Sequence, residues 1–342
     1  MDTIRVGFVG LGSICKSRHV PGLRRIGGVE IVAVANRTME SSQRAAAQFD
    51  IPEACASWEE IVQRKDIDAV FIGTWPYMHK EVSVAALESG KHVFCQARMA
   101  RDFAEAEAMH ETARRSGRVA ALCPVPIGLS IDATIARLLR EGDLGDIRLV
   151  RVQSFTDAFA RPEAPLHWRK DHRLSGLNMH TLGMYAEVIH RWFGWTWTVN
   201  AVTQTFTPTR LDPAGQETRV RIPDQVLFTA GMRAGFPVQY TISAAVHHGE
   251  EEIQVFGSEA SLAYDVNDDV LYGARAGEVM GPVEIRPGEE YDLHEWPVER
   301  NFINAIREGA EYHPDFHDGL KYMQVVQAVY DSAREGRTVM LG

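Results

Sequence analysis

The sequence contains few cysteines, and the four that it has are far apart. Cys15, Cys55, Cys95 and Cys123 occur singly, without the close pairs that zinc sites and redox dithiols show. We therefore expect four free thiols. Histidines and carboxylates also form no group at ligand spacing, so the sequence predicts no metal site.

Long apolar runs are also missing. The first apolar segment, residues 4–9, is far shorter than a signal-peptide core with its cleavage site or a membrane span, and we expect a cytoplasmic protein. Basic residues number 36 against 46 acidic ones. The resulting net charge of -10 repels polyphosphate backbones, so we expect no nucleic acid as a partner. The short apolar segment gives no reason to expect a membrane as a partner either.

The composition is that of a globular protein. Hydrophobic residues make up 45% and charged residues 24% of the chain, which excludes disordered, collagen-like and coiled-coil classes. No internal repeat or low-complexity tract is present. Because 342 residues exceed one ordinary hydrophobic core, the length predicts two domains.

A glycine-rich turn follows the first apolar segment. Gly10 and Gly12 precede helix-compatible residues, in the order strand, turn and helix that fits the dinucleotide fingerprint G-x-G-x-x-G/A. Gly10 permits the tight turn, and Gly12 lets the backbone approach a pyrophosphate beside Ser13 and Ile14. Cys15, a compact residue, takes the third small position. A turn without a ligand is the alternative interpretation.

The second apolar segment ends in Asn36, Arg37 and Thr38, where such a fingerprint has its ribose-binding residue. An acidic residue there would bind both ribose hydroxyls of NAD. Asn36 carries no charge, whereas Arg37 can pair with a 2'-phosphate and lie against adenine. The sequence therefore favours NADP, with NAD as the other candidate; a solvated arginine in a turn is the alternative interpretation.

Two further apolar segments, residues 68–74 and 91–95, each follow a helical stretch. Parallel strands joined by helices form a doubly wound α/β sheet. Ligands of such sheets bind beyond the carboxyl ends of the strands, so the glycine turn and residues 36–38, 74–79 and 96–98 share one rim. Within it, residues 75–77 either stack against nicotinamide or a sugar ring or form the core of a loop.

Short motifs follow one another along nearly the whole chain. They are Gly-Leu-Gly-Ser-Ile-Cys with His19 and Pro21 after it, residues 74–79 in place of Thr-Pro-Asn-x-x-His, residues 88–93, Trp168-Arg169, residues 256–260, and the closing helix from Asp318 to Gly336. In this set the chain resembles the Gfo/Idh/MocA family of sugar and polyol dehydrogenases. The resemblance implies an N-terminal Rossmann domain, residues 1–123, and a C-terminal α/β domain, residues 124–342. It also implies that the second domain has a large, open, mostly antiparallel sheet, which contacts substrate and often joins subunits into a dimer or tetramer.

The pattern of the second half agrees with that implication. A helix is expected around residues 131–141, followed by strands at 147–153, 198–206, 225–228 and 238–245. Proline, glycine and aspartate punctuate residues 207–215 and 267–281, which we interpret as loops.

The resemblance fails at the catalytic motifs. Family members carry Glu-Lys-Pro, whose lysine hydrogen-bonds the reacting hydroxyl, whereas this chain has Gln96, Ala97 and Arg98. Ala97 can neither donate nor accept a proton. Without the proline the usual cause of a cis peptide is also lost. Arg98 is instead a candidate to bind an anionic substrate.

The second family motif, Asp-x-Gly-x-His-x-x-Asp, falls on residues 181–188, where only Gly183 is kept. If residues 178–192 form one helix, Asn178, Thr181 and Tyr185 share a face with Val188. We expect that face to meet the nicotinamide. A neighbouring stripe, His180, Met184, Glu187 and Arg191, is expected to serve packing or a salt bridge.

Tyr185 is the preferred candidate for the role of the family histidine, because a phenol passes a proton when a nearby cation lowers its pKa. Lys170 is a candidate to replace the missing lysine. A half-buried core tyrosine with a satisfied hydroxyl is the alternative interpretation. Substrate contacts are expected from Arg98, Asn178, Thr181 and Arg169. The expected cofactor contacts are Gly10, Gly12, Ser13, Ile14, Asn36, Arg37, Thr38, Thr74, Trp75, His79, Gln96 and Trp168.

Three functions remain open at this point. The first is an NAD(P)-dependent oxidoreductase that interconverts a hydroxyl and a carbonyl on a sugar, cyclitol or related polyol. The second is a lyase, epimerase or glycosidase that retains its cofactor through a redox cycle. The third is a sensor that binds a dinucleotide or sugar without catalysis.

Overall fold

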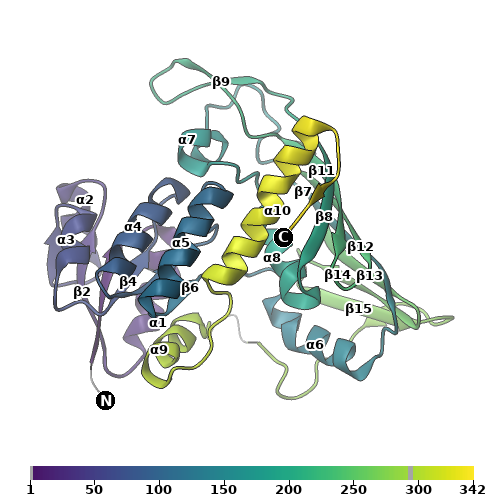
Figure 1. Ribbon diagram of the computed structural model, residues 1–342, viewed down its shortest axis with the longest axis horizontal. Helices are drawn as coiled ribbons and strands as arrows, with labels where there is room; N and C mark the ends of the chain where they lie inside the picture. The colour runs from purple at the N-terminus through teal and green to yellow at the C-terminus, as the bar shows by residue number, and fades with distance from the viewer. Residues whose placement is uncertain (1–2, 292–295) are drawn as a thin grey trace. The chain divides into compact units, whose positions relative to one another are not determined.

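The computed structural model describes residues 3–291 and 296–342. The chain divides into two compact units, Met1–Pro124 with His294–Leu320, and Val125–Leu293 with Lys321–Gly342 (Figure 1). The predicted single boundary between residues 123 and 124 lies one residue before the point at which the chain first passes from one unit to the other. It is wrong for the segment near residue 300, which returns to the first unit.

The first unit is built on six parallel strands in the order β3-β2-β1-β4-β5-β6. This is the order of a Rossmann sheet, which confirms the predicted fold class. The strands are β1 Ile4–Val9, β2 Val29–Ala35, β3 Glu53–Cys55, β4 Ala69–Ile72, β5 His92–Cys95 and β6 Ala120–Leu122; the helices are α1 Val20–Arg24, α2 Met39–Gln48, α3 Trp58–Gln63, α4 Pro76–Glu88, α5 Phe103–Ser116 and α9 Val298–Glu308.

The strands of this sheet are apolar because they are covered on both faces. All four residues of β4 are buried, as are the last four of β1, the near-continuous burial that parallel sheets show. The sequence predicted β1, β2, β4 and β5. It did not reveal β3 and β6, which have three residues each and are too short to show a pattern.

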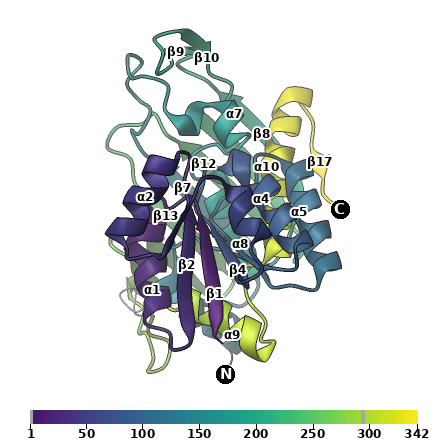
Figure 2. The ribbon, with the colours of Figure 1, turned by 90° about the vertical axis from the view of Figure 1, so that its left-hand side faces the viewer.

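Helix α9 belongs to the core of the first unit although it lies far along the chain. The ring of Phe302 is 5.4 Å from the ring of Phe71 in β4 and 5.4 Å from that of Phe94 in β5. Helix α9 also packs against α1 (Figure 2). The apolar side chains of α9 thus complete the hydrophobic core that the first 124 residues begin.

The second unit is built on a nine-stranded sheet in the order β16-β15-β14-β13-β7-β12-β11-β8-β17. Neighbouring strands are antiparallel, except that β7 and β12 run parallel. The large, mostly antiparallel sheet that the family resemblance implies is therefore confirmed. Its strands are β7 Ile147–Phe155, β8 Thr196–Gln204, β11 Gln225–Met232, β12 Pro237–Ser243, β13 Glu251–Gly257, β14 Ala260–Asp265, β15 Val270–Arg275, β16 Gly281–Pro282 and β17 Val339–Met340.

Helices cover one face of this sheet. These are α6 Asp132–Glu141, α8 Leu182–Phe193 and, from Lys321 onward, α10 Phe316–Glu335, while the short α7 spans His172–Ser175 (Figure 1). In β7, Val150, Val152 and Ser154 are buried, while Arg151 is exposed and Gln153 half-buried. The alternation shows which face of the sheet packs on helices.

Two expected loops contain strands. Residues 209–211 form β9, which pairs with β10 Glu217–Arg219 in a hairpin. Residues 270–275 form β15, in continuous antiparallel register with β14. The polar residues at the start of the expected loop form the turn between β14 and β15, where Asp269 has a positive φ of 56° and Asp265 accepts the amides of Asn267 and Asp268.

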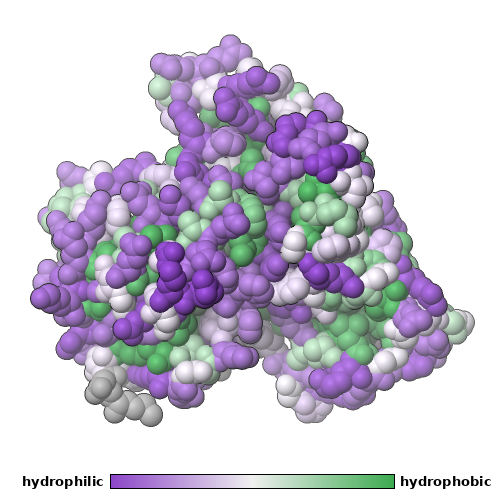
Figure 3. Space-filling view, viewed as in Figure 1, coloured by the Kyte–Doolittle hydropathy of each residue, from purple (hydrophilic) through white to green (hydrophobic). Residues whose placement is uncertain are grey.

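The surface is mixed in character. Hydrophilic residues cover most of the face seen in Figure 3, with hydrophobic residues in smaller patches among them. Across residues 3–291 and 296–342, no helix combines the length and apolar character that a membrane crossing requires.

Candidate active site

A cavity of about 480 Å³ opens at the carboxyl ends of β1, β2, β3 and β4. Six of the predicted cofactor contacts meet in it: Gly10, Gly12, Asn36, Arg37, Thr74 and Trp75. The other residues that line it are Val9, Leu11, Ala35, Ser41, Ala56, Ser57, Trp58, Gly73, Tyr77 and Met78.

The glycines of the turn are required by close contacts with Gly73 and Thr74, which follow the neighbouring strand β4. Gly10 has a positive φ of 78°, and a Cβ there would lie 2.6 Å from Cγ2 and 2.9 Å from the backbone N of Thr74. A Cβ on Gly12 would lie 3.0 Å from the carbonyl oxygen of Gly73. The two positions therefore keep the floor of the cavity free of side chains.

Cys15 fits the third small position because Gly73 leaves room for it. A Cβ on Gly73 would lie 2.2 Å from Sγ of Cys15 and 2.3 Å from the carbonyl oxygen of Gly10. Burial raises the pKa of the Cys15 thiol to about 12, so the group is packed and unreactive. All four cysteines are free, as predicted, and all four are buried.

Asn36 shapes the turn instead of offering its carbonyl oxygen to a ribose. Its Oδ1 accepts the backbone N–H of Leu11 at 2.8 Å, and its Nδ2 donates to the carbonyl of Ser41 at 3.0 Å. Arg37 next to it is exposed, and its guanidinium lies 4.9 Å from the centre of the Trp75 ring. No carboxylate among the described residues forms an ion pair with Arg37, which leaves its N–H groups for a ligand.

Several predicted cofactor contacts lie outside the cavity lining. Ser13 and Ile14 are exposed just before the helical turn Cys15–His19, which leads into α1, and backbone N–H groups at such a start lack intrahelical acceptors. Thr38 caps α2 by accepting the N–H of Ser41 at 3.3 Å. Trp168 belongs to the second unit.

His79 is a buried structural residue, which corrects its assignment as a cofactor contact. Its side chain is buried in α4, with Nδ1 3.0 Å from the carbonyl of Arg98 and Nε2 3.0 Å from that of Thr74. Burial lowers the pKa of His79, while these carbonyls act in the opposite direction. The ring thus ties two rim segments together.

Gln96 also has a structural partner. Its amide donates to Nε2 of His19, whose Nδ1 hydrogen-bonds Glu299 at the start of α9. The Nε2 group is therefore used within the first unit, and the contact of the half-buried Gln96 with the cofactor stays a prediction. The Ala97–Arg98 peptide bond is cis, contrary to the expectation drawn from the missing proline, and Arg98 is buried at 7% exposure.

Helix α8 begins at Leu182, later than predicted. Residues 179–181 form a turn in which His180 has a positive φ of 34°, a conformation that interrupts a helix. Asn178 therefore does not share a helical face with Tyr185; it is buried, and its Nδ2 donates to the carbonyl of Ser175 at 2.7 Å. Thr181 lies just before α8, with its Oγ1 2.9 Å from Oγ of Ser154.

Tyr185 is fully buried in α8 and hydrogen-bonded to an acid. Its hydroxyl donates to Oε1 of Glu251 in β13 at 3.0 Å. Burial, reinforced by the Glu251 carboxylate, raises the pKa of the phenol. The sequence had predicted a lowered pKa beside a cation; among the described residues the charged partner of the hydroxyl is an anion, and the shift is in the opposite direction.

Lys170 is committed to structure, which corrects its assignment to catalysis. Its ammonium donates to Oδ1 of Asp224 at 2.6 Å and to the carbonyls of Ile222 and Pro223 at 2.7 and 2.9 Å, so its three donors are used. Burial lowers the pKa of Lys170 while Asp224 opposes the shift. Arg169 beside it is exposed, with its guanidinium 4.4 Å from the centre of the Trp168 ring.

The predicted salt bridge of the neighbouring stripe on α8 is confirmed. Arg191 pairs with Glu187 one turn earlier at 2.8 Å and with Asp132 at 2.9 Å. The guanidinium also donates to the carbonyl of Ile127 at 2.7 Å. These bonds fasten α8 to the segment that enters α6.

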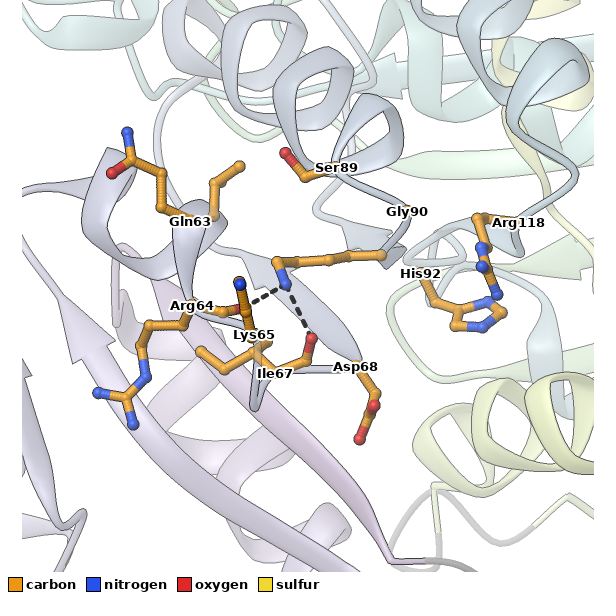
Figure 4. Close-up of a pocket in the computed structure, with 11 residues that line it drawn as sticks. Gln63, Arg64, Lys65, Ile67, Asp68, Ser89, Gly90, His92 and Arg118 are labelled. Atoms are coloured by element: carbon orange, nitrogen blue, oxygen red, sulfur yellow. Dashed lines mark hydrogen bonds between the residues drawn. The ribbon is translucent and has the colours of Figure 1, made fainter.

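A second cavity of about 430 Å³ lies at the opposite end of the Rossmann sheet, beside the starts of β4 and β5 (Figure 4). Lys91 crosses it to donate to the carbonyls of Arg64 and Ile67 at 2.6 and 2.9 Å. Dinucleotides bind beyond the carboxyl ends of parallel strands. This cavity is therefore not the cofactor site.

The described part of the chain holds one group with metal-like spacing, which the sequence did not reveal. His313, Asp315 and Asp318 surround the start of α10. Asp315 and Asp318 accept each other's backbone N–H at 2.9 Å, and His313 lies 2.6 Å from Asp318. These bonds form a helix cap, and no ion is needed to explain them.

The first cavity has the features that a dinucleotide requires. Gly10 and Gly12 give a close backbone approach, Arg37 supplies a cation, and Oγ1 of Thr74 is buried without a hydrogen-bond partner among the described residues. Together with the strand order, they define a dinucleotide-binding protein of the Rossmann class.

Comparison with known families gives the same result for both halves of the chain. Residues 4–122 match the profile of the oxidoreductase family with an NAD-binding Rossmann fold, and residues 136–341 match the C-terminal alpha/beta domain of that family. The chain belongs to the Gfo/Idh/MocA family of oxidoreductases.

Individual relatives are distant but cover most of the chain. Levoglucosan dehydrogenase of Pseudarthrobacter phenanthrenivorans is 25% identical, with 89% of this chain and 87% of the relative covered. The scyllo-inositol 2-dehydrogenase (NADP(+)) of Bacillus subtilis is also 25% identical, with 100% and 97% covered. A levoglucosan dehydrogenase apo structure has the same fold, with a TM-score of 0.91 at 22% identity over 100% of this chain and 99% of that one.

Sequence reasoning missed several residues of the dinucleotide cavity and of the polar cluster around Tyr185. Ser57 and Trp58 line the cavity after β3. The pattern Ser57-x-x-Glu60, which is typical of a helix start, could have revealed their position. Ser154 and Glu251 in the second unit left no local signal, because only the pairing of β7 with β13 brings them to Tyr185.

Proposed function

We propose that this oxidoreductase interconverts a hydroxyl and a carbonyl on a sugar, cyclitol or related polyol, and that it prefers NADP to NAD. The substrate class is supported by full-length relatives that act on levoglucosan and scyllo-inositol by name. When bound, the nicotinamide supplies the two-electron acceptor or donor.

The observation that carries the cofactor preference is the position of Arg37. It is the one charged residue among the described residues that line the cavity, and no carboxylate stands where the ribose of NAD would be bound. An exposed guanidinium without an ionic partner suits the 2'-phosphate of NADP.

The substrate side is proposed from the second unit. Tyr185 and Thr181 are joined through Ser154 and Glu251, a polar cluster that matches the position of the family's second motif. Arg98 and Arg169 remain proposed substrate contacts as cations that could bind an anionic group, whereas the argument for Asn178 is lost because it does not share a helical face with Tyr185. Lys170 is not included, because its ammonium is fully engaged.

The test begins with the purified protein as it is isolated. Mass spectrometry identifies any retained dinucleotide, and calorimetry compares the affinities for NADP and NAD. The protein is then incubated with a panel of sugars, cyclitols and polyols while reduced-cofactor absorbance and products are followed. Net oxidation or reduction supports the proposal; product without net cofactor change indicates a redox cycle, and binding without product indicates a sensor.

We also propose that the outer face of the nine-stranded sheet joins two copies of the chain. Val202 in β8 and Leu227 in β11 are cross-strand neighbours with exposed fractions of 64% and 38%. Trp197 lies on the same strand at 39%. Light scattering after size-exclusion chromatography would show a dimer or tetramer, and Val202→Lys would shift it toward the monomer.

A further inference from the structure

The cavity at the amino ends of β4 and β5 is nearly as large as the dinucleotide cavity, at about 430 Å³ against about 480 Å³. It lies wholly within the first unit. Its lining comes from residues 62–65 and 67–68 around the end of α3, residues 89–92 between α4 and β5, and Arg118 before β6 (Figure 4). A space of this size accommodates a small organic molecule.

The lining is cationic in a chain that is acidic overall. Lys65, Lys91 and Arg118 form no ion pair with a carboxylate of the described residues, whereas the fourth cation, Arg64, is paired with neighbouring acids. Of the described residues that line the cavity, only Asp68 carries a carboxylate, and its Oδ2 accepts a backbone N–H of β1 at 2.8 Å. The chain as a whole has a net charge of -10, so this cavity stands out as a place that attracts an anion.

The ammonium of Lys91 is buried and has a donor to spare. The side chain is 5% exposed, and it donates to the carbonyls of Arg64 and Ile67 at 2.6 and 2.9 Å. An ammonium has three N–H donors, and none of the described residues accepts the third. Burial lowers the pKa of Lys91, an effect that Asp68 opposes. A bound anion would accept the third N–H and offset the cost of burying the charge.

The backbone at the ends of α3 and α4 does not stand in the way of an anion. Carbonyls at the carboxyl end of a helix carry partial negative charge, and both helices end at this cavity. The carbonyls of residues 85–87 in α4 accept the N–H groups of residues 89–91. Lys91 occupies the carbonyl of Arg64, the residue that follows α3. These carbonyls therefore already have donors of their own.

Uncharged donors and a guanidinium stand near the ammonium. Burial, aided by Arg118, lowers the pKa of His92 to about 4. The neutral ring accepts the N–H of Val119 at Nδ1, which leaves its proton on Nε2. The exposed hydroxyl of Ser89 has no hydrogen-bond partner among the described residues. The guanidinium of Arg118 lies beside Gly90, where a Cβ would be 3.9 Å from Nη2.

We propose that this cavity is a second ligand site and that it binds a small organic phosphate. A phosphate group carries up to two negative charges at pH 7 and offers three strong acceptor oxygens. It therefore suits three cations and their neutral donors better than a single carboxylate does. Lys91 binds the phosphate from the buried side, while Lys65 and Arg118 bind it from two other sides of the cavity (Figure 4). The rest of the ligand fills the remaining volume.

The first experiment uses the protein saturated with the dinucleotide that it binds more tightly, so that the dinucleotide cavity is closed to other phosphates. Calorimetry at constant ionic strength then measures inorganic phosphate, pyrophosphate and phenyl phosphate, which lack the hydroxyl groups of a polyol. Citrate is the carboxylate control. We expect one site per chain for at least one phosphate probe and weaker binding of citrate. No heat with any phosphate probe, or citrate bound as tightly, would overturn the proposal.

The second experiment removes the two exposed cations and leaves the buried Lys91 in place. Lys65→Ala combined with Arg118→Ala should weaken binding of the phosphate probe roughly 10-fold. The matched control combines Lys80→Ala with Arg115→Ala, which are exposed cations outside the lining, and it should bind like the wild type. Melting temperatures report whether each protein is folded. Equal affinities in the three folded proteins would place the probe elsewhere and refute the site.

The third experiment locates the probe in the wild-type protein and needs no substitution. Pyrophosphate should shift the backbone amide NMR resonances of residues 89–92 in the dinucleotide-saturated protein. Those of Gly10 and Gly12 should stay in place. The opposite pattern, with residues 89–92 unmoved, would contradict the proposal even if heat is measured. None of these experiments requires turnover, so the second ligand site is tested independently of the proposed oxidoreductase reaction.

Discussion

The guanidinium of Arg37 lies 4.9 Å from the centre of the Trp75 ring, so residues that follow two different strands of the Rossmann sheet meet at the mouth of the dinucleotide cavity. The attraction between the cation and the ring stabilises the position of Arg37 at the cavity. Among the described residues no carboxylate forms an ion pair with its guanidinium, so its N–H groups remain available to a phosphate. This geometry gives the first prediction.

Arg37→Ala should weaken NADP binding roughly 10- to 100-fold, since a charged hydrogen bond contributes about 1.5–3 kcal/mol. The affinity for NAD, which lacks the 2'-phosphate, should change much less. Calorimetry with both dinucleotides measures the difference. Arg44→Ala, an exposed arginine on α2 outside the cavity lining, is the control, and an equal loss for both dinucleotides in Arg37→Ala would contradict the assignment.

Gly10→Ala should destabilise the turn and abolish dinucleotide binding. Its backbone has a φ of 78°, and the new Cβ would press on Thr74. The left-handed conformation alone costs a non-glycine residue about 1–2 kcal/mol, so the melting temperature should fall. Gly27→Ala, where no atom lies within 4 Å of the new Cβ, should bind and melt like the wild type. A fully active Gly10→Ala protein would refute the role of the turn.

Phe302→Ala should destabilise the first unit, because the ring is fully buried between Phe71 and Phe94. The removal of a buried phenylalanine costs about 3–5 kcal/mol. Denaturant unfolding of the protein with bound dinucleotide measures this decrease in the free energy of unfolding. Phe206→Ala removes a ring that is 54% exposed and should change little; equal effects of the two substitutions would argue against α9 as part of this core.

Lys170→Met should lower stability more than it lowers kcat. The substitution leaves Asp224 buried without its cation, and a broken buried pair costs about 3–5 kcal/mol. Thermal melting and kcat at a temperature well below the transition separate the two effects. A large drop in kcat at unchanged melting temperature would instead restore the catalytic role that the sequence first suggested.

Stability should fall in mild acid because of His92. Burial, aided by Arg118, lowers the pKa of His92 to about 4, and its Nδ1 accepts the N–H of Val119 at 3.0 Å. Between pH 6.5 and 4 the unfolded chain therefore binds the proton that the folded chain refuses, and the free energy of unfolding decreases as the pH falls. The contribution is complete above pH 6.5.

His92→Asn keeps an acceptor near Nδ1 but cannot be protonated. Urea unfolding at pH 7 and pH 4.5 should show a smaller difference for this variant than for the wild type. His317→Asn, at a half-buried histidine of α10, serves as the matched substitution. If the two variants depend on pH alike, His92 does not set the acid sensitivity.

Local patterns predicted the parts of the molecule that local sequence determines. Four of the Rossmann strands, the glycine turn and the Glu187–Arg191 pair all depend on residues within a few positions of each other. Arg37 and Trp75 could be placed on one rim because parallel strands of one sheet end at the same edge. The cavity was thus predictable from the sequence in its main residues.

Pairing between distant segments decided the rest. Glu251 lies 66 residues from Tyr185, and only the register of β13 on β7 brings it to the phenol. Lys170 has a side chain that could serve in catalysis, but its ammonium forms an ion pair with Asp224, 54 residues later. The positive φ of His180 also has no sequence signature, and it moved the start of α8 past Asn178.

The return of α9 to the first unit has a consequence for synthesis on the ribosome. The Rossmann sheet is complete once residue 122 has emerged, yet its apolar layer still lacks Phe302. Some 180 further residues must be translated before that gap closes, which is the distance from β6 to α9 and takes on the order of ten seconds or more at ordinary elongation rates. During that interval the nascent sheet exposes an apolar surface. Chaperones that recognise apolar segments can bind to it.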